Sequence, residues 1–457
     1  MPTITTRNPA TGEDLQTYEL FHDTDVAKVV EAAGTAFETW RREPIQARAD
    51  VVRRLATLLR DNEQELCELM TAEMGKPMAQ GRQEVQLCAA ICEWTADHGP
   101  DVLADREEPK EGGRALVTHQ PMGVVYGIQP WNFPIYQVVR FSVPQLVAGN
   151  TVLLKHAESV WGMGLRLEEL YHEAGVPRDA FRSLLIDHDQ SDDVIARPEV
   201  RGVTLTGSDG AGRQVAATAG QHLTKTVVEL GSNDAFLVLS DADVELAVET
   251  SVQGRIANNG QTCVAAKRFI VTDAVYDAFT DAYVEAMSSV ELGDPTDEEC
   301  ALGPMSREQL RDELHQQVTE SVSKGATIRT GGEVPDRPGA WYPATVLTDV
   351  QPGQPAYDDE LFGPVAAIIR AADDEDAMRI ANDSRYGLGG GIFSRDVDRA
   401  VELARTEFDT GMVNVNGYNL ANPHLPFGGV KDSGYGREHG EEGFKEFVNT
   451  KTVMIDD

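Results

Sequence analysis

A cysteine and a glutamate have the residue types and the setting that nucleophilic chemistry requires. Cys263 ends the segment Asn-Asn-Gly-Gln-Thr-Cys at 258–263, and Glu229 lies 263 − 229 = 34 positions earlier, inside Val-Val-Glu-Leu-Gly. A thiol needs a base nearby to become a good nucleophile, and a thioester needs an activated water for its release. Because apolar residues flank Glu229, we expect a partly desolvated carboxyl with a raised pKa, as a general base near neutral pH requires.

A third segment, Pro-Trp-Asn-Phe-Pro at 130–134, contains an amide side chain between two prolines. A tetrahedral intermediate needs hydrogen-bond donors already in place around its oxyanion. The side-chain NH₂ of Asn132 and the backbone N–H of Cys263 would supply two such donors. The prolines restrict the loop, which suits either this role or an ordinary turn asparagine.

Together these segments resemble the active site of the NAD(P)-dependent aldehyde dehydrogenase superfamily. The resemblance runs from Asn-Pro-Ala-Thr-Gly at 8–12 to Pro-Phe-Gly-Gly-Val-Lys at 426–431. It implies that Cys263 attacks an aldehyde, that Asn132 stabilises the oxyanion, and that Glu229 activates the water that releases a thioester. Within the superfamily the chain is most similar to the short bacterial succinate-semialdehyde dehydrogenases, on segments such as Ala-Ala-Lys-Arg-Phe at 265–269.

The resemblance also implies a binding site for a nicotinamide cofactor. Lys155 ends a predicted strand and corresponds to a ribose-binding lysine, while Glu158 would accept from ribose hydroxyls and repel a 2′-phosphate. NAD is therefore expected, with NADP as the alternative. Three residues at a predicted strand-to-helix turn let the backbone approach a pyrophosphate: Gly207, Ser208 and Gly212. The remaining cofactor residues that the family implies are Trp131, Leu230, Glu360 and Phe362.

A carboxylated aldehyde is the expected substrate, because Arg140 lies eight residues, about two helical turns, after Asn132. A guanidinium binds a carboxylate bidentately. The alternative is an arginine paired with a surface acid, since the chain is so acidic. Arg255 is a weaker second candidate, and Phe133 and Phe427 complete the expected substrate residues. Succinate semialdehyde, glutarate semialdehyde, other short carboxylated aldehydes and simple aliphatic ones all stay open.

Three other functions fit the sequence less well than aldehyde oxidation. A CoA-dependent acylating enzyme is disfavoured because Glu229 is retained. A non-catalytic binding or structural protein is disfavoured by the complete set of cofactor and catalytic residues. A cysteine hydrolase is disfavoured because no histidine stands in an evident relation to Cys263.

Helices and short apolar strands alternate along the chain and predict an α/β fold with parallel sheets. The family fold implies a Rossmann-like NAD-binding domain at 1–98 and 122–231, and an α/β catalytic domain at 232–445. A small β arm at 99–121 and 446–457 would join subunits into a homodimer or homotetramer. Strands are expected at 151–155, 183–186, 201–205 and 226–229, with helices at 161–174, 191–197 and 209–219 between them.

Composition excludes several partners. The 457 residues include 75 acidic and 40 basic ones, for a formal charge of −35, and only ten of the basic residues are lysines. Nucleic acid needs a basic stripe, so it is not expected as a partner. The acid-rich surface is typical of cytoplasmic proteins from salt-loving organisms. No apolar run of membrane-spanning length and no signal segment is seen, so a cytoplasmic location away from membranes is expected. The five cysteines show no disulfide framework and no metal-ligand spacing.

Overall fold

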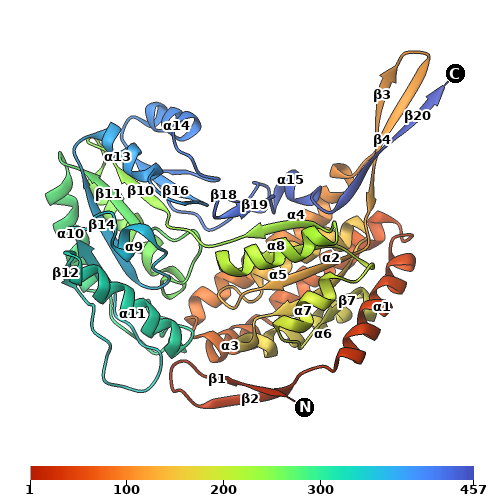
Figure 1. Cartoon of the computed structure of the whole chain (residues 1–457), viewed down its shortest axis with the longest axis horizontal. Coiled ribbons are helices and arrows are strands. Elements are labelled where there is room, and N and C mark those ends of the chain that lie inside the picture. The colour runs from red at the N-terminus through yellow and green to blue at the C-terminus, as the bar shows by residue number, and fades with distance from the viewer. Residues whose placement is uncertain (1, 457) are drawn as a thin grey trace.

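Two parallel sheets, a helical layer and a projecting arm make up the computed structural model, which describes residues 2–456 (Figure 1). The first sheet has the order β19 (Gly434–Tyr435), β9 (Lys225–Glu229), β8 (Val200–Thr206), β5 (Val124–Gln129), β6 (Thr151–His156) and β7 (Phe181–Ser183). All neighbours are parallel except β19, which pairs with β9 antiparallel. The strands β5 and β6 are buried along almost their whole length, because helices cover both faces of the sheet.

The second sheet has the order β12 (Thr327–Thr330), β13 (Thr345–Thr348), β14 (Val365–Ala371), β11 (Arg268–Thr272), β10 (Ala235–Val238), β16 (Gly390–Phe393) and β17 (Asn414–Val415). Only the edge strand β12 runs antiparallel to its neighbour. Two small antiparallel pairs stand apart from these sheets: β1 (Thr3–Arg7) with β2 (Asp14–Glu19), and β15 (Tyr386–Gly387) with β18 (Val430–Lys431).

Helices fall into two groups that follow the two sheets. The first group is α1 (Asp23–Trp40), α2 (Ile45–Asp61), α3 (Glu63–Met74), α4 (Met78–Val102), α5 (Tyr136–Ala148), α6 (Trp161–Ala174), α7 (His188–Ile195) and α8 (Asp209–Gln221). The second is α9 (Val244–Ile256), α10 (Tyr276–Ser288), α11 (Glu308–Ser323), α12 (Pro355–Asp358), α13 (Asp374–Asn382) and α14 (Val397–Thr406), followed by α15 (Gly440–Phe444). Three 3₁₀ turns, η1 (Glu158–Val160), η2 (Arg178–Ala180) and η3 (Ala257–Gly260), complete the elements.

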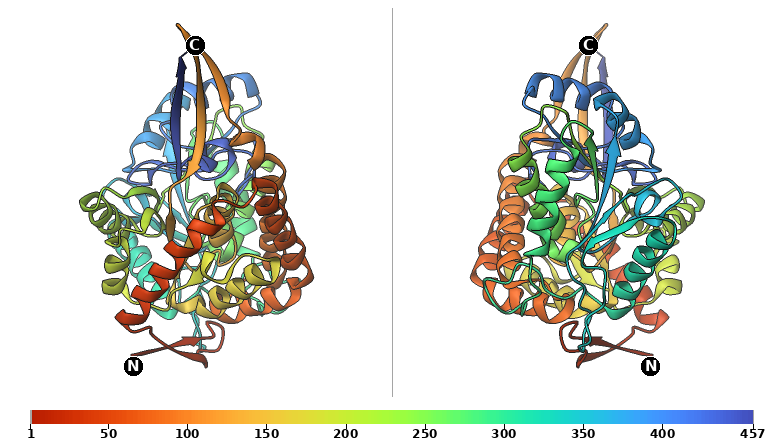
Figure 2. Two further views of the ribbon diagram at one scale, coloured as in Figure 1. Left: turned by 90° about the vertical axis from the view of Figure 1, so that its right-hand side faces the viewer. Right: turned by 90° about the vertical axis from the view of Figure 1, so that its left-hand side faces the viewer.

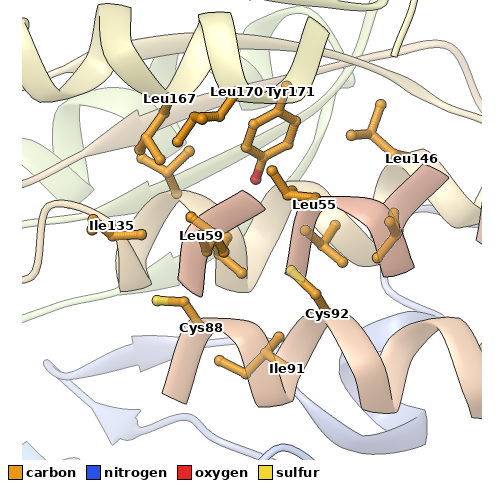
Figure 3. Close-up of a cluster of buried hydrophobic side chains, with 14 of the residues drawn as sticks. Leu55, Leu59, Cys88, Ile91, Cys92, Ile135, Leu146, Leu167, Leu170 and Tyr171 are labelled. Atoms are coloured by element: carbon orange, nitrogen blue, oxygen red, sulfur yellow. The ribbon is translucent and has the colours of Figure 1, made fainter. Parts of the chain in front are cut away.

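The largest apolar core lies among α2, α4, α5 and α6. Leu55 and Leu59 of α2 meet Ile91 of α4 and Leu146 of α5, with Leu167, Leu170 and Tyr171 of α6 above them (Figure 3). Cys88 and Cys92 lie one helical turn apart in this core and are fully buried, as is Cys67. These three cysteines therefore pack as small apolar residues, as the sequence led us to expect.

A three-stranded arm projects from the body of the molecule, as both the front view and the two side views show (Figures 1 and 2). It consists of β3 (Arg106–Lys110), β4 (Gly113–Pro121) and the C-terminal strand β20 (Val448–Asp456), in the order β20-β4-β3. The terminal strand pairs antiparallel with β4 along its whole length, from Val448 opposite Pro121 to Asp456 opposite Gly113. The predicted pairing of the tail with another strand is thus seen.

Several predicted boundaries need correction. The helix α4 continues through Pro100 to Val102, so the arm begins after residue 99. The chain also returns to the first sheet at β19, well before residue 445, and Phe444 packs in the core of the first unit. The strand expected at 183–186 is β7 at 181–183. The helix expected at 191–197 starts at His188, because Asp187 and Gln190 form a capping box there.

Candidate active site

The catalytic elements meet where strands of the first sheet end and the second unit begins. Glu229 is the last residue of β9, Lys155 lies near the end of β6, and the 130–134 loop follows β5. In parallel sheets all the carboxyl ends lie on one edge, which is where ligands bind. The loop that carries Cys263 comes from the second unit, after α9 and η3.

Two asparagines shape the cysteine loop. Asn258 and Asn259 have φ of 55° and 56°, the left-handed region in which asparagine is enriched. The Asn259 side chain donates to the carbonyls of Gly75 at 2.9 Å and Pro304 at 2.8 Å, and it accepts from the N–H of Gly303 at 2.7 Å. The loop is therefore fixed against the α3–α4 connection before the chain reaches Cys263.

Gly260 joins the cysteine loop to the loop that carries Glu360. Its φ is +72°, and a Cβ at this position would lie 2.3 Å from the carbonyl carbon of Gly363. Only glycine meets both conditions. This close packing explains how Glu360, predicted from sequence as a cofactor residue, comes to lie beside the nucleophile segment.

Asn132 lies against the cysteine loop, as its predicted role requires. Its Nδ2 donates to the Gln261 carbonyl at 3.1 Å, and Asn258 Nδ2 donates in turn to the Asn132 carbonyl at 2.7 Å. An amide has two N–H groups. One is used by Gln261, so the second is free to meet an oxyanion.

Glu229 is a buried carboxyl without hydrogen bonds. It is 2% exposed, and among residues 2–456 neither of its oxygens has a hydrogen-bond partner. Burial raises the pKa of Glu229 well above its usual value, and the nearby carboxylate of Glu438 raises it further, while Arg140 and Arg437 oppose the shift. A carboxyl in this state binds a proton more readily than an exposed one, which is the direction predicted from its apolar neighbours.

Cys263 packs beside Val264, Leu388 and Phe427. Burial raises the pKa of the Cys263 thiol to about 11, while Arg140 and then Lys267 lower it. The thiol is therefore kept protonated in the isolated protein, and its ionisation depends on charges near it. The predicted substrate residue Phe427 is thus a neighbour of the nucleophile.

The predicted substrate residue Arg140 is paired with an acid of the same chain. Arg140 is 1% exposed and forms an ion pair with buried Glu438. Its Nη2 also donates to Thr206 Oγ1 at 2.9 Å, and its guanidinium lies over the Tyr136 and Phe427 rings at 5.0 and 4.7 Å. The charge that was expected to meet a substrate carboxylate is already balanced by a buried acid of the same chain, and not by a surface acid.

Arg255 lies behind the cysteine loop. It is fully buried, and its Nη2 donates to the Gly260 carbonyl at 2.6 Å. Arg255 thus contacts the backbone of the cysteine loop and directly supports the conformation of that loop. Burial lowers the pKa of Arg255 to about 10.

The residues expected at the pyrophosphate turn have the required context. Ser208 caps α8 and accepts from the Ala211 N–H at 3.3 Å, and Gly207 leads out of β8. A Cβ on Gly212 would lie 2.4 Å from a Leu230 methyl carbon, so the helix can approach the end of β9 only with glycine there. The first N–H groups of α8 have no partners within the helix, and such a turn suits an anion.

The ribose and nicotinamide candidates come from both units. Burial lowers the pKa of Lys155, and Glu158 and Asp187 act against that shift. Trp131 and Phe362 meet edge to face with ring centroids 5.8 Å apart. Glu360 and Phe362 line a cavity of about 500 Å³ beside α11. Trp131 and Phe362 thus bring the 130–134 loop of the first unit against the Glu360 loop of the second.

Four residues near the site were not predicted. Lys267 contacts the Cys263 carbonyl, and Glu438 pairs with Arg140. Tyr136 OH lies 2.9 Å from His439 Nε2. Burial, aided by Arg140, lowers the pKa of His439 to about 3, so this histidine stays neutral. For Lys267 the sequence offered one weak signal, which is its position four residues after the cysteine. It offered no signal for the contacts that join residues 136–140 to residues 438–439.

Comparison with known proteins places the chain in a family. Residues 2–453 match the aldehyde dehydrogenase family. A succinate-semialdehyde dehydrogenase [NADP(+)] of Deinococcus radiodurans is 46% identical, with 98% of this chain and 94% of that protein covered. A succinate semialdehyde dehydrogenase [NAD(P)+] of Escherichia coli is 43% identical, with coverage of 98% and 97%. The crystal structure of succinic semialdehyde dehydrogenase from Streptococcus pyogenes in complex with NADP+ aligns with a TM-score of 0.97 at 38% identity, over 99% and 100% of the two chains.

The chain therefore belongs to the aldehyde dehydrogenase family. It is an oxidoreductase that acts on aldehydes, on the fold that the sequence predicted. None of the helices within residues 2–456 combines the length and the apolar character needed to cross a membrane.

Proposed function

We propose that this enzyme oxidises succinate semialdehyde to the carboxylic acid with NAD(P), through a thioester on Cys263. The relatives named above, which are similar over nearly their full length, support this substrate. The observation that carries the mechanism is the Glu229 carboxyl, which is buried, has a raised pKa and has no hydrogen-bond partner among residues 2–456.

In the first step, the Cys263 thiolate attacks the aldehyde carbon and the carbonyl π bond opens to an oxyanion. The second N–H of Asn132 and the backbone N–H of Cys263 stabilise this oxyanion. Because Asn132 is held by Gln261 and Asn258, the donor needs no reorganisation when charge develops. Loss of one such donor costs on the order of 10²–10³ in rate.

In the second step, the tetrahedral carbon loses hydride and becomes a thioester. A bound nicotinamide ring supplies the hydride acceptor. Trp131, Phe362 and Glu360 would hold that ring and its ribose, while Lys155 and the start of α8 would hold the rest of the cofactor. Their origin in both units means that the cofactor would bridge the two sheets.

In the third step, Glu229 takes a proton from water, and the hydroxide oxygen bonds to the acyl carbon. The carbon–sulfur bond breaks, the acid leaves, and the thiolate is restored. Since a protonated carboxyl cannot act as the base, the rate of this step should rise with pH through the raised pKa of Glu229. The free oxygens of Glu229 leave room for the water that it must activate.

For substrate recognition we propose that Arg140 attracts the distal carboxylate while it stays paired with Glu438. Its position between Tyr136 and Phe427, close to Cys263, supports this role. Phe133 and Phe427 would provide apolar walls. Arg255 stays a weaker candidate, because its visible contact is with Gly260.

Rates on succinate semialdehyde and on propanal test the substrate proposal. Arg140→Leu alone is ambiguous, because it also leaves Glu438 unpaired. Glu438→Gln is therefore the matched background, in which Arg140→Leu should lower kcat/KM for succinate semialdehyde by roughly tenfold or more, as loss of a charged hydrogen bond does. The loss for propanal should be much smaller. Equal losses on both aldehydes would contradict a carboxylate anchor.

For the cofactor we propose that NAD is preferred and NADP is also accepted. Glu158 starts η1, three residues after Lys155, where a carboxylate would repel a 2′-phosphate. The named relatives that use NADP(+) support its acceptance here.

For assembly we propose a homodimer or homotetramer built through the arm. The arm exposes Val453 and Met454, which are 40% and 70% exposed, and β20 has one unpaired edge. The molar mass in solution by light scattering tests this, and a monomer would contradict it. A cytoplasmic location stays an expectation from the sequence.

A further inference from the structure

Lys267 is a buried cation directly behind the nucleophile. It is 1% exposed and lies four residues after Cys263, just before β11. Its ammonium contacts three acceptors: the Cys263 carbonyl, Ser232 Oγ at 3.0 Å and Glu360 Oε1 at 3.0 Å. Two of these contacts are hydrogen bonds, and the third is an ion pair.

Two of these acceptors cannot move away. The Cys263 carbonyl belongs to the cysteine loop and is also contacted by Ser232 Oγ at 2.6 Å. Ser232 is fully buried and also donates to Asp234 Oδ1 at 2.6 Å. Lys267 is therefore anchored to the backbone of Cys263 and to the start of β10.

The third acceptor, Glu360, lies at the border of the cofactor cleft. Its side chain is 18% exposed and lines the cavity of about 500 Å³ together with Phe362. On the inner side its Oε1 also accepts from the Ser232 N–H at 3.1 Å. Glu360 thus has buried partners on one side and an open cavity on the other, and it can leave Lys267 without crossing the core.

The charges around the Cys263 thiol come from several elements. The cations are Arg140 of α5 and Lys267, and the anions are Glu360 and Asp234. Tyr136 and Tyr418 also face the thiol, and burial raises the pKa of both phenols, so they remain neutral. Glu438 balances Arg140 inside the core. The charge of Lys267 is opposed by Glu360, which borders the cavity, and by Asp234, which is held by Ser232 Oγ and the Gly389 N–H.

We propose that Lys267 is a positioning residue that couples Glu360 to Cys263. While Glu360 lies against Lys267, the carboxylate offsets part of the effect of the ammonium on the thiol. When Glu360 turns into the cavity toward cofactor hydroxyls, the ammonium stays behind, anchored to the Cys263 backbone, and favours the thiolate. The proposal rests on the proposed function in one respect, which is the role of Glu360 as a cofactor residue.

The pH dependence of Cys263 alkylation by iodoacetamide, without cofactor, tests the charge coupling. Below its pKa a thiol reacts in proportion to its thiolate fraction, so a shift of one unit changes the rate about tenfold. Lys267→Met and Lys267→Gln should both slow alkylation by roughly tenfold at a given pH and move the pH profile upward. Lys267→Arg keeps the charge and should stay near wild type. Cys263→Ser measures the background from the other four cysteines.

A double-variant comparison separates charge from structure. Glu360→Gln should speed alkylation in the wild type, because Lys267 is left unbalanced. The same change in Lys267→Met should have a much smaller effect, because the carboxylate is then held only by the Ser232 N–H and no longer by the ammonium. The proposal is overturned if Glu360→Gln acts equally in both backgrounds. It is also overturned if both neutral Lys267 variants leave the position of the pH profile unchanged.

Added NAD or NADP tests the link to the cofactor. Binding, followed by tryptophan fluorescence, should move the alkylation profile of the wild type to lower pH and move that of Lys267→Met far less. Equal shifts in both proteins would overturn the proposal. If neither nucleotide binds to the wild type, the proposed function fails, while the cofactor-free variants still decide the Lys267–Glu360 coupling.

Discussion

At the scale of single residues, the site is a set of buried ionisable groups, and each group shifts the pKa of its neighbours. Arg140 is paired with Glu438, Glu438 raises the pKa of Glu229, and Arg140 lowers the pKa of Cys263. Coulomb energies grow as the local dielectric falls, so these few groups can decide which of the thiol and the carboxyl is ionised. The proposed cofactor preference belongs to the same scale, because it would depend on the single carboxylate of Glu158.

Replacing Glu158 should change the preference between the two nucleotides. Glu158→Gln keeps the size of the side chain and removes the charge that would repel a 2′-phosphate. We expect the ratio of kcat/KM for NADP to that for NAD to rise about fivefold or more, since one unit charge at contact is worth at least about 1 kcal/mol. Steady-state rates with both nucleotides give this ratio. An unchanged ratio would show that the carboxylate does not face the ribose.

At the scale of elements, a buried ion pair positions the oxyanion loop. Glu84 of α4 accepts from the backbone N–H groups of Ile135 and Tyr136 at 2.8 and 2.9 Å, at the start of α5. Lys76 pairs with Glu84 and lies 3.9 Å from the Phe133 ring centroid. Phe133, the residue after Asn132, is therefore contacted by Lys76 of the α3–α4 connection, while Glu84 of α4 holds the start of α5.

Breaking this pair should cost both stability and activity. Glu84→Gln leaves Lys76 charged and unpaired in a fully buried place, which costs about 3–5 kcal/mol of the free energy of unfolding. Lys76→Met combined with Glu84→Gln removes the uncompensated charge and should regain much of that loss. Thermal unfolding of the two variants makes the comparison. A double variant less stable than Glu84→Gln would contradict this account.

The elements also show what the sequence could and could not predict. Alternating apolar strands and helices predicted the parallel sheets, because burial on both faces leaves a continuous apolar run. The segments around Asn132, Glu229 and Cys263 predicted the site, because their chemistry is local to each segment. The partner of Arg140 could not be predicted, since Glu438 reaches it only after the chain returns to the first sheet through β19.

At the scale of the whole molecule, the formal charge of −35 sets the conditions for stability. Many of the acids are exposed, and the ion pairs at the surface use only part of the 40 basic residues. Like charges repel over about 10 Å at 0.1 M salt but only about 3 Å at 1 M. Repulsion among the carboxylates should therefore destabilise the folded state at low salt, and this repulsion should be weaker at high salt.

Stability should rise with potassium chloride between low and molar concentrations. We expect the midpoint of thermal unfolding to increase steadily over this range because salt screens repulsion among the carboxylates. Sucrose, which does not screen charge, serves as the control. A midpoint that stays constant or falls with salt would show that self-repulsion does not limit this fold.

The central claim is that Cys263 carries the acyl group and that Glu229 activates the water that releases it. Glu229→Gln tests this most directly, by mass spectrometry after mixing with succinate semialdehyde and NAD(P). We predict one equivalent of NAD(P)H per active site, then a stall, with a succinyl group on the peptide that contains Cys263. Continued turnover at the wild-type rate, or an acyl group on any other residue, would contradict the account.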